Sequence, residues 1–176
     1  MLTPTLFQFF RRQLAHGLSR QGLSEPLAVN YISDMLSRFA QTRQLYAIRD
    51  RQGIPLEHLV DLEAERLALQ ARDGAGVHRA RELRLCRHLG EFALFMSGFF
   101  RPRLQSRGQL GYYIDCGRNA FWHCAALERE AARRRLFQSL YCNFALISHT
   151  LHELRQRRFN NTPAPVAGPR HALWHL

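Results

Sequence analysis

The chain has 176 residues, of which 46% are hydrophobic and 22% are charged. This composition is too apolar for a disordered protein, and the length is typical of one domain with one core. All 25 basic residues are arginine, and against 14 acidic residues they give a formal net charge of +11. The charge favours anionic partners, whereas the absence of lysine is typical of a coding bias and indicates no function.

Nothing in the sequence predicts a membrane span or a secretory signal. The most apolar run, residues 92–100, is far shorter than the roughly 18 residues that cross a bilayer. Arg11 and Arg12 follow the short apolar start of the chain, the reverse of the order in a secretory signal. We therefore expect a cytoplasmic protein without a membrane partner, and we interpret its cysteines as reduced, buried side chains: Cys86, Cys116, Cys124 and Cys142.

Two amphipathic helices are predicted at the start of the chain. The first has Thr3 as its N-cap and Pro4 at its first position, with apolar residues at steps of four: Leu6, Phe10, Leu14 and Leu18. Gly22 is expected to end this helix. Pro26 then opens a second helix that ends near Thr42 and carries one apolar face: Ala28, Tyr31, Met35 and Phe39.

A third helix is predicted beyond a polar connection over residues 43–53. It begins at Pro55 and Glu57, is broken by the glycine-rich residues 73–76, and turns an apolar face inward: Val60, Ala64, Leu67 and Ala71. The fourth helix runs from Val77 to Phe99 and becomes apolar on all sides. Its second half is therefore expected at the centre of the protein.

The fifth helix is predicted from Gln109 to about Glu130, after a break bracketed by Pro102 and Gly108. Small residues on one of its faces, at positions 117 and 120, would let another helix approach closely. The sixth helix has the most regular pattern in the chain, with apolar residues at alternating steps of three and four: Phe137, Leu140, Phe144, Ile147, Leu151 and Leu154.

These elements predict an all-α fold, an irregular bundle of five or six helices. We expect a single domain over residues 1–159. Residues 160–176 contain three prolines and are predicted to form a tail, whose apolar end at Trp174 is typical of a segment that docks on a protein surface.

Catalytic and metal motifs give little support for an enzyme. The sequence has no G-x-S-x-G, no P-loop and no dinucleotide fingerprint. Cys116 and His123 fit one face of the fifth helix, and His149 and His152 stand three residues apart. Zinc sites need three or four donors, so we expect no metal and no cofactor. A metal or haem pocket that combines these residues with His88 is kept as an alternative.

Acidic residues within apolar helical stretches predict a buried polar cluster. Glu91 and Asp115 lie on the fourth and fifth helices, and a buried acid requires a partner, which Arg118 or His88 could provide. Tyr112 is placed in the same cluster. A structural ion pair is favoured over an acid–base pair, because no nucleophile or phosphate cradle accompanies it.

Three groups of arginines are candidates for contact with phosphate or nucleic acid. The alternative for each is a solvated helix face. The groups are Arg81 with Arg84, then Arg133, Arg134 and Arg135, and finally Arg155, Arg157 and Arg158.

Two segments resemble a pattern found in uncharacterised bacterial helical proteins. They are GEFALFMSGFF at residues 90–100 and GYYIDCGRNAF at residues 111–121. The family pattern is Gly, an acid, two residues, Leu and an aromatic, followed later by Gly-Phe-Phe and Tyr-Tyr-x-x-x-Gly-Arg-x-Ala. The resemblance implies a helical fold and no mechanism, with one shared structural unit containing Glu91, Tyr112, Tyr113, Gly117 and Arg118.

The leading hypothesis from the sequence is a non-catalytic interaction or regulatory module. Its helix faces and tail would hold a protein partner or a second copy of the chain. The first alternative is nucleic-acid binding through the arginine groups. The second is the metal or haem pocket within the bundle.

Overall fold

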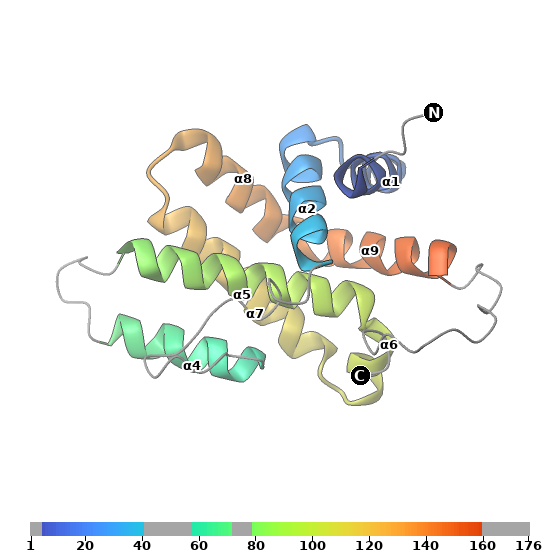
Figure 1. The fold of residues 1–176 in the computed structure, drawn as a ribbon. Helices are drawn as coiled ribbons and strands as arrows, with labels where there is room; N and C mark the ends of the chain where they lie inside the picture. The colour runs from blue at the N-terminus through green and yellow to red at the C-terminus, as the bar shows by residue number, and fades with distance from the viewer. Residues whose placement is uncertain (1–4, 41–57, 72–78, 160–176) are drawn as a thin grey trace.

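The computed structural model describes residues 5–40, 58–71 and 79–159 (Figure 1). Within these ranges the chain forms eight helices and no strand, so the all-α class is confirmed and the predicted count of five or six helices is wrong. None of these helices is both long and apolar enough to cross a membrane. In chain order they are α1 (Leu6–Arg20), α2 (Pro26–Phe39), α4 (Leu59–Gln70), α5 (Arg79–Phe99), α6 (Arg101–Ser106), α7 (Leu110–Leu127), α8 (Ala131–Cys142) and α9 (Phe144–Phe159).

Helix α1 starts two residues later than predicted. Thr5 is the N-cap, because its hydroxyl accepts from the Gln8 amide and the Gln8 side chain accepts from the Thr5 amide, 3.0 Å away. The predicted cap at residues 3–4 lies outside the described residues. Gly22 ends the helix as predicted: its φ is 79°, and the next amide, that of Leu23, donates to the carbonyl of Leu18.

Helices α5 and α7 form the centre of the bundle and run alongside each other (Figure 1). The predicted close approach at Gly117 of α7 is confirmed, since a Cβ there would overlap the ring of Phe144 and lie 2.9 Å from the Cβ of Ala93. Gly98 likewise lets α5 approach α9, where a Cβ would lie 2.6 Å from that of Leu151.

Two parts of the chain are divided more finely than predicted. The predicted break between Pro102 and Gly108 contains the short helix α6, because Pro102 ends α5 but fits the first turn of a new helix. The predicted sixth helix is two helices, α8 and α9, separated at Asn143. Asn143 is the C-cap of α8, and its side chain donates to the carbonyl of Ser139, 3.0 Å away. All six of the predicted apolar residues are nevertheless buried.

Helix α4 packs with the opposite face from the one predicted. Val60, Ala64, Leu67 and Ala71 are all exposed. The buried residues of α4 are Leu59, Leu62, Arg66 and Leu69. The predicted connection at 43–53, the helix start at 55–57, the turn at 73–76 and the tail at 160–176 lie outside the described residues.

Candidate functional site

The residues predicted to form one buried polar cluster do not all come together. His88 and Glu91 are buried on α5, as predicted. Tyr112 is 44% exposed and Asp115 is also exposed, both on the outside of α7. Arg118 lies half-buried with its guanidinium 5.1 Å from the centre of a tyrosine ring of α8. The cluster of five is therefore wrong, because α7 turns its small residues toward α5 and carries positions 112, 115 and 118 away from it.

Glu91 finds its partners on α2 instead. The Tyr31 hydroxyl donates to one carboxylate oxygen at 2.6 Å, and Arg38 donates to both oxygens at 2.9 and 3.3 Å. Arg87 adds a more distant positive charge at 3.9 Å. Sequence reasoning missed these partners, which lie 53 and 60 residues away from Glu91. The one available signal was that Tyr31 and Arg38 are seven residues apart and share a helix face.

This arrangement holds α2 to α5 and offers no reactive group. Both carboxylate oxygens of Glu91 are occupied by donors, so the ion pair is fully hydrogen-bonded. Burial raises the pKa of Tyr31 well above its ordinary value, and the charge of Glu91 raises it further, which keeps the phenol protonated. The observed contacts favour the structural ion pair over the acid–base pair.

A second polar cluster lies between α4 and α7. Buried Arg66 donates from Nε to Glu63 at 2.9 Å, and its Nη1 lies 3.4 Å from Nε2 of His123 on α7. Alongside, Arg81 of α5 donates to Glu65 of α4 at 2.8 Å. Burial, helped by the charge of Arg66, lowers the pKa of His123, so the imidazole stays neutral at pH 7. These contacts attach α4 to α5 and α7.

The candidate metal ligands form no site within the described part of the chain. No group of three or more His, Cys, Asp or Glu residues is arranged there to hold an ion. Burial raises the pKa of Cys116, which disfavours the thiolate that metals require. His149 lies 3.7 Å from Glu153, and Nε2 of His152 lies 3.0 Å from the side-chain amide nitrogen of Gln156. His88 packs between aromatic rings of α2 and α5.

Four of the eight predicted phosphate-binding arginines already have protein partners. Arg133 pairs with Glu130 at 3.1 Å, Arg157 lies 3.6 Å from Glu153, and Arg134 donates to the backbone carbonyl of Glu128 at 3.1 Å. Arg81 is paired with Glu65, as described above. Arg84 and Arg135 are exposed, Arg155 is half-buried, and the side chain of Arg158 lies outside the described residues.

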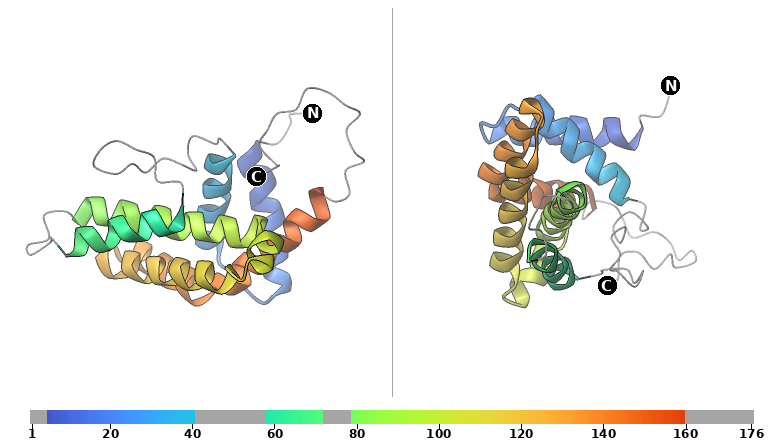
Figure 2. Two further views of the ribbon diagram at one scale, coloured as in Figure 1. Left: turned by 90° about the horizontal axis from the view of Figure 1, so that it is seen from below. Right: turned by 90° about the vertical axis from the view of Figure 1, so that its left-hand side faces the viewer.

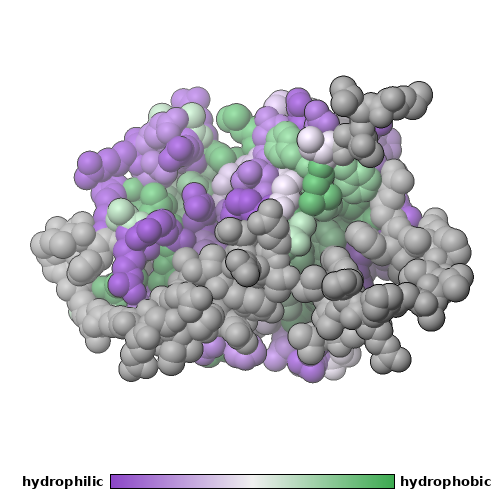
Figure 3. Space-filling model, viewed as in Figure 1, coloured by the Kyte–Doolittle hydropathy of each residue, from purple (hydrophilic) through white to green (hydrophobic). Residues whose placement is uncertain are grey.

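The arginines without an ion pair are spread over the surface. Nine of them are exposed and form no ion pair with an acid in the described ranges: Arg11, Arg12, Arg20, Arg84, Arg103, Arg107, Arg129, Arg134 and Arg135. They come from α1, α5, α6, α8 and the turn before α8. Figure 3 shows hydrophilic residues gathered over α8, at the upper left of the face drawn. The exposed arginines without an ion pair therefore come from several helices and are not confined to one of them.

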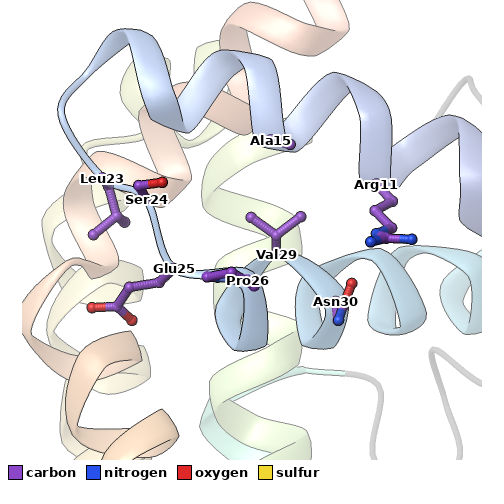
Figure 4. Close-up of a pocket in the computed structure, with 8 residues that line it drawn as sticks. All are labelled: Arg11, Ala15, Leu23, Ser24, Glu25, Pro26, Val29 and Asn30. Atoms are coloured by element: carbon purple, nitrogen blue, oxygen red, sulfur yellow. The ribbon is translucent and has the colours of Figure 1, made fainter.

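A small pocket lies at the corner between α1 and α2 (Figure 4). Its volume is about 200 Å³, below the range of roughly 300–1,000 Å³ that is typical of ligand pockets. Arg11 extends into it from α1, and Glu25 and Asn30 line it from the side of α2. Glu25 also accepts a hydrogen bond from Ser139 of α8, so it serves the attachment of α2. We assign no ligand to this pocket.

The exposed side of α4 is the most unusual surface of the described residues. Val60 is 62% exposed and Leu67 is 53% exposed, although α4 is firmly docked through its other side. With Ala64 and Ala71 they form a continuous apolar stripe at steps of four, three and four, which we name the outer seam. Helix α4 lies at the edge of the bundle beside the first half of α5 (Figures 1 and 2). The outer seam therefore faces away from the core.

Comparison of the chain with protein-family models, with curated proteins and with solved structures found no match. The resemblance to uncharacterised bacterial helical proteins stays a prediction.

Proposed function

We propose that the protein is a helical interaction module and that the outer seam of α4 is its docking surface for a partner helix. The observation that carries the proposal is the exposure of Val60 and Leu67 on one stripe of a helix whose opposite stripe is buried. A helix that is apolar on two opposite sides is normally covered on both. Helix-in-groove and coiled-coil partners are recognised through the heptad spacing that the outer seam has.

Other exposed apolar side chains do not form such a stripe. Leu27 is 61% exposed on α2, but the next residues on that side, at positions 30 and 34, are polar. Trp122 and Tyr112 are both exposed on α7, yet they are ten residues apart, which is about 15 Å along the helix axis. Single exposed apolar residues are ordinary on soluble proteins, whereas a stripe indicates an interface.

The experiment is site-specific photo-crosslinking in cells that produce the protein naturally. A benzophenone amino acid replaces Leu67 in one variant and Leu27 in the control, whose exposure is similar. We expect a defined crosslinked protein, identified by mass spectrometry, from position 67 and none from position 27. Equal background crosslinking from the two positions would contradict the proposal.

A second candidate function is binding to an anionic polymer, which the nine exposed arginines without ion pairs favour. Phosphate contacts of this kind depend steeply on salt, because counterions are released. Fluorescence anisotropy with random duplex DNA and with single-stranded RNA tests it at 50 and 200 mM salt. Affinity that drops by about ten-fold or more between the two salt concentrations supports it. Absence of binding at low salt removes this candidate.

A further inference from the structure

We propose that the outer seam is covered by α4 of a second copy of this chain, packed antiparallel about a two-fold axis. This inference rests on the proposed function and names its partner. An isologous contact of this kind requires a surface that is complementary to itself. Three features of α4 meet that requirement.

The first feature is the alternation of large and small residues along the outer seam. In an antiparallel pair Val60 faces position 71 of the other copy, and Leu67 faces position 64, so every large residue meets an alanine. Layers of one large and one small residue interlock without a void. In a parallel pair each residue meets itself, and two leucines at one layer alternate with two alanines at the next. The antiparallel arrangement therefore fills the interface evenly.

The second feature is the charge beside the outer seam. Two rows of residues flank the outer seam, with Asp61 and Ala68 on one edge and Glu63 and Gln70 on the other. In the antiparallel pair each edge meets the same edge of the second copy, so Asp61 lies across from Ala68 and Glu63 lies across from Gln70. No acid faces an acid across the contact. Glu63 is moreover already neutralised by Arg66 of its own helix, and Glu65 by Arg81. The contact is thus free of the like-charge pairs that oppose association.

The third feature is the location of α4 on a strongly basic molecule. The chain carries a formal charge of +11, so two copies repel each other over most of their surface. Helix α4 carries three acids, Asp61, Glu63 and Glu65, against one arginine, Arg66, which gives it a formal charge of −2. Because Glu63 and Glu65 are paired with arginines, a contact between two copies of α4 brings together one acid without an ion pair from each copy, Asp61, and avoids the surfaces where arginines would face arginines.

The expected association is weak. Helix α4 has 12 residues and is about 18 Å long, so the outer seam is smaller than a standard interface of roughly 1,600 Å². Standard interfaces already extend down to micromolar affinity. We therefore expect a reversible dimer in sedimentation velocity between about 1 and 200 μM. Higher salt should strengthen it, since the remaining repulsion between the two copies is screened.

Substitutions at the outer seam test its role and its register. Leu67→Glu is expected to leave only monomer over this range, while the control Leu27→Glu leaves the dimer unchanged. Ala64→Leu makes the outer seam more apolar but places a leucine against Leu67 of the second copy. We expect it to weaken the dimer by ten-fold or more. A tighter dimer with Ala64→Leu would overturn the proposed register, because an unspecific apolar contact would gain from the larger side chain.

Disulfide crosslinking tests the direction of the two helices. In a Cys142→Ser background, which removes an exposed native cysteine, Val60→Cys protein is mixed with Ala71→Cys protein and oxidised. The antiparallel pair predicts a crosslink between positions 60 and 71 of different copies. Crosslinks between two copies of position 60, or between two copies of position 71, would overturn it in favour of a parallel pair.

The outcomes separate this inference from the proposed function. A chain that stays monomeric at all concentrations, while position 67 crosslinks a different protein in cells, overturns the dimer and supports the interaction module. A monomer with no specific crosslink from position 67 overturns both. A dimer that Leu67→Glu abolishes and Leu27→Glu does not supports both.

Discussion

The centre of the bundle and helix α4 use their apolar residues in different ways. In α5, α7 and α9 the apolar faces are buried against neighbouring helices, and glycines bring the backbones into close contact. Helix α4 has two candidate faces of similar apolar content. The one that is buried includes Arg66, and the more continuous one is exposed. The buried side of α4 places three leucines and Arg66 against its neighbours, so the unbroken apolar stripe of this helix is not the one that is buried.

The largest effect is expected from a cavity at the centre. Phe144 is fully buried and packs on Phe121, so Phe144→Ala should lower the free energy of unfolding by about 4 kcal/mol. The matched change on α4, Leu67→Ala, should cost less than about 0.5 kcal/mol, as at an exposed site. Guanidinium denaturation followed by circular dichroism measures both. Similar losses for the two variants would remove the contrast between the regions.

The second largest loss of stability is expected when the ion pair between α2 and α5 is removed. Glu91→Ala leaves Arg38 and the Tyr31 hydroxyl without their acceptor, and we expect a loss of about 3 kcal/mol. Tyr31→Phe removes one hydrogen bond and should cost about 1 kcal/mol. Urea denaturation at pH 7 gives both values. Equal losses of stability for Glu91→Ala and Tyr31→Phe would contradict the role of the Glu91–Arg38 ion pair in holding α2 to α5.

The close contact of α7 with its neighbours predicts a smaller loss of stability for an alanine at Gly117. An alanine at Gly111 is the control, and it is expected to raise the stability. Gly117→Ala adds a Cβ against the buried ring of Phe144, and we expect a net loss of about 2 kcal/mol despite the better helix propensity of alanine. Gly111→Ala is on the same helix with nothing within 4 Å, and it should stabilise by up to about 1 kcal/mol. Thermal unfolding compares the two. Stabilisation by both substitutions would contradict the close approach of α7.

These contrasts also show what the sequence could and could not predict. The faces of α1, α2, α8 and α9 were predictable because each has one apolar stripe, which only one orientation buries. The break at Asn143 was not predictable from the sequence, because Phe144 continues the apolar stripe of α8 into α9 with the same spacing. The partners of Glu91 were not predictable either, because they depend on how α2 crosses α5, and no local sequence pattern encodes that crossing. The buried side of α4 was not predictable, because the unbroken apolar stripe is the exposed one and the buried side is interrupted by Arg66.

The polar contact between α4 and α7 predicts a modest pH dependence. Burial and Arg66 lower the folded-state pKa of His123 below the unfolded value of about 6.5. The stability that neutral His123 contributes is therefore fully present above that pH and is lost as the pH falls through the folded-state pKa. His123→Asn removes this titration, so the stability of the variant should decline less between pH 7.5 and pH 5. Urea denaturation across this range checks it, and parallel curves for both proteins would contradict it.

The most direct test of the account concerns the two sides of α4. At a concentration where the chain is monomeric, the exposed pair is changed in Val60→Glu/Leu67→Glu, and the buried side is changed in Leu62→Glu. Exposed sites tolerate such changes within about 0.5 kcal/mol, whereas a charge buried at Leu62 should prevent α4 from docking on α5. Hydrogen exchange should therefore show an unchanged α4 in the first variant and loss of its protection in the second. Loss of α4 protection in Val60→Glu/Leu67→Glu would mean that the outer seam belongs to the core, and the proposed docking surface would not exist.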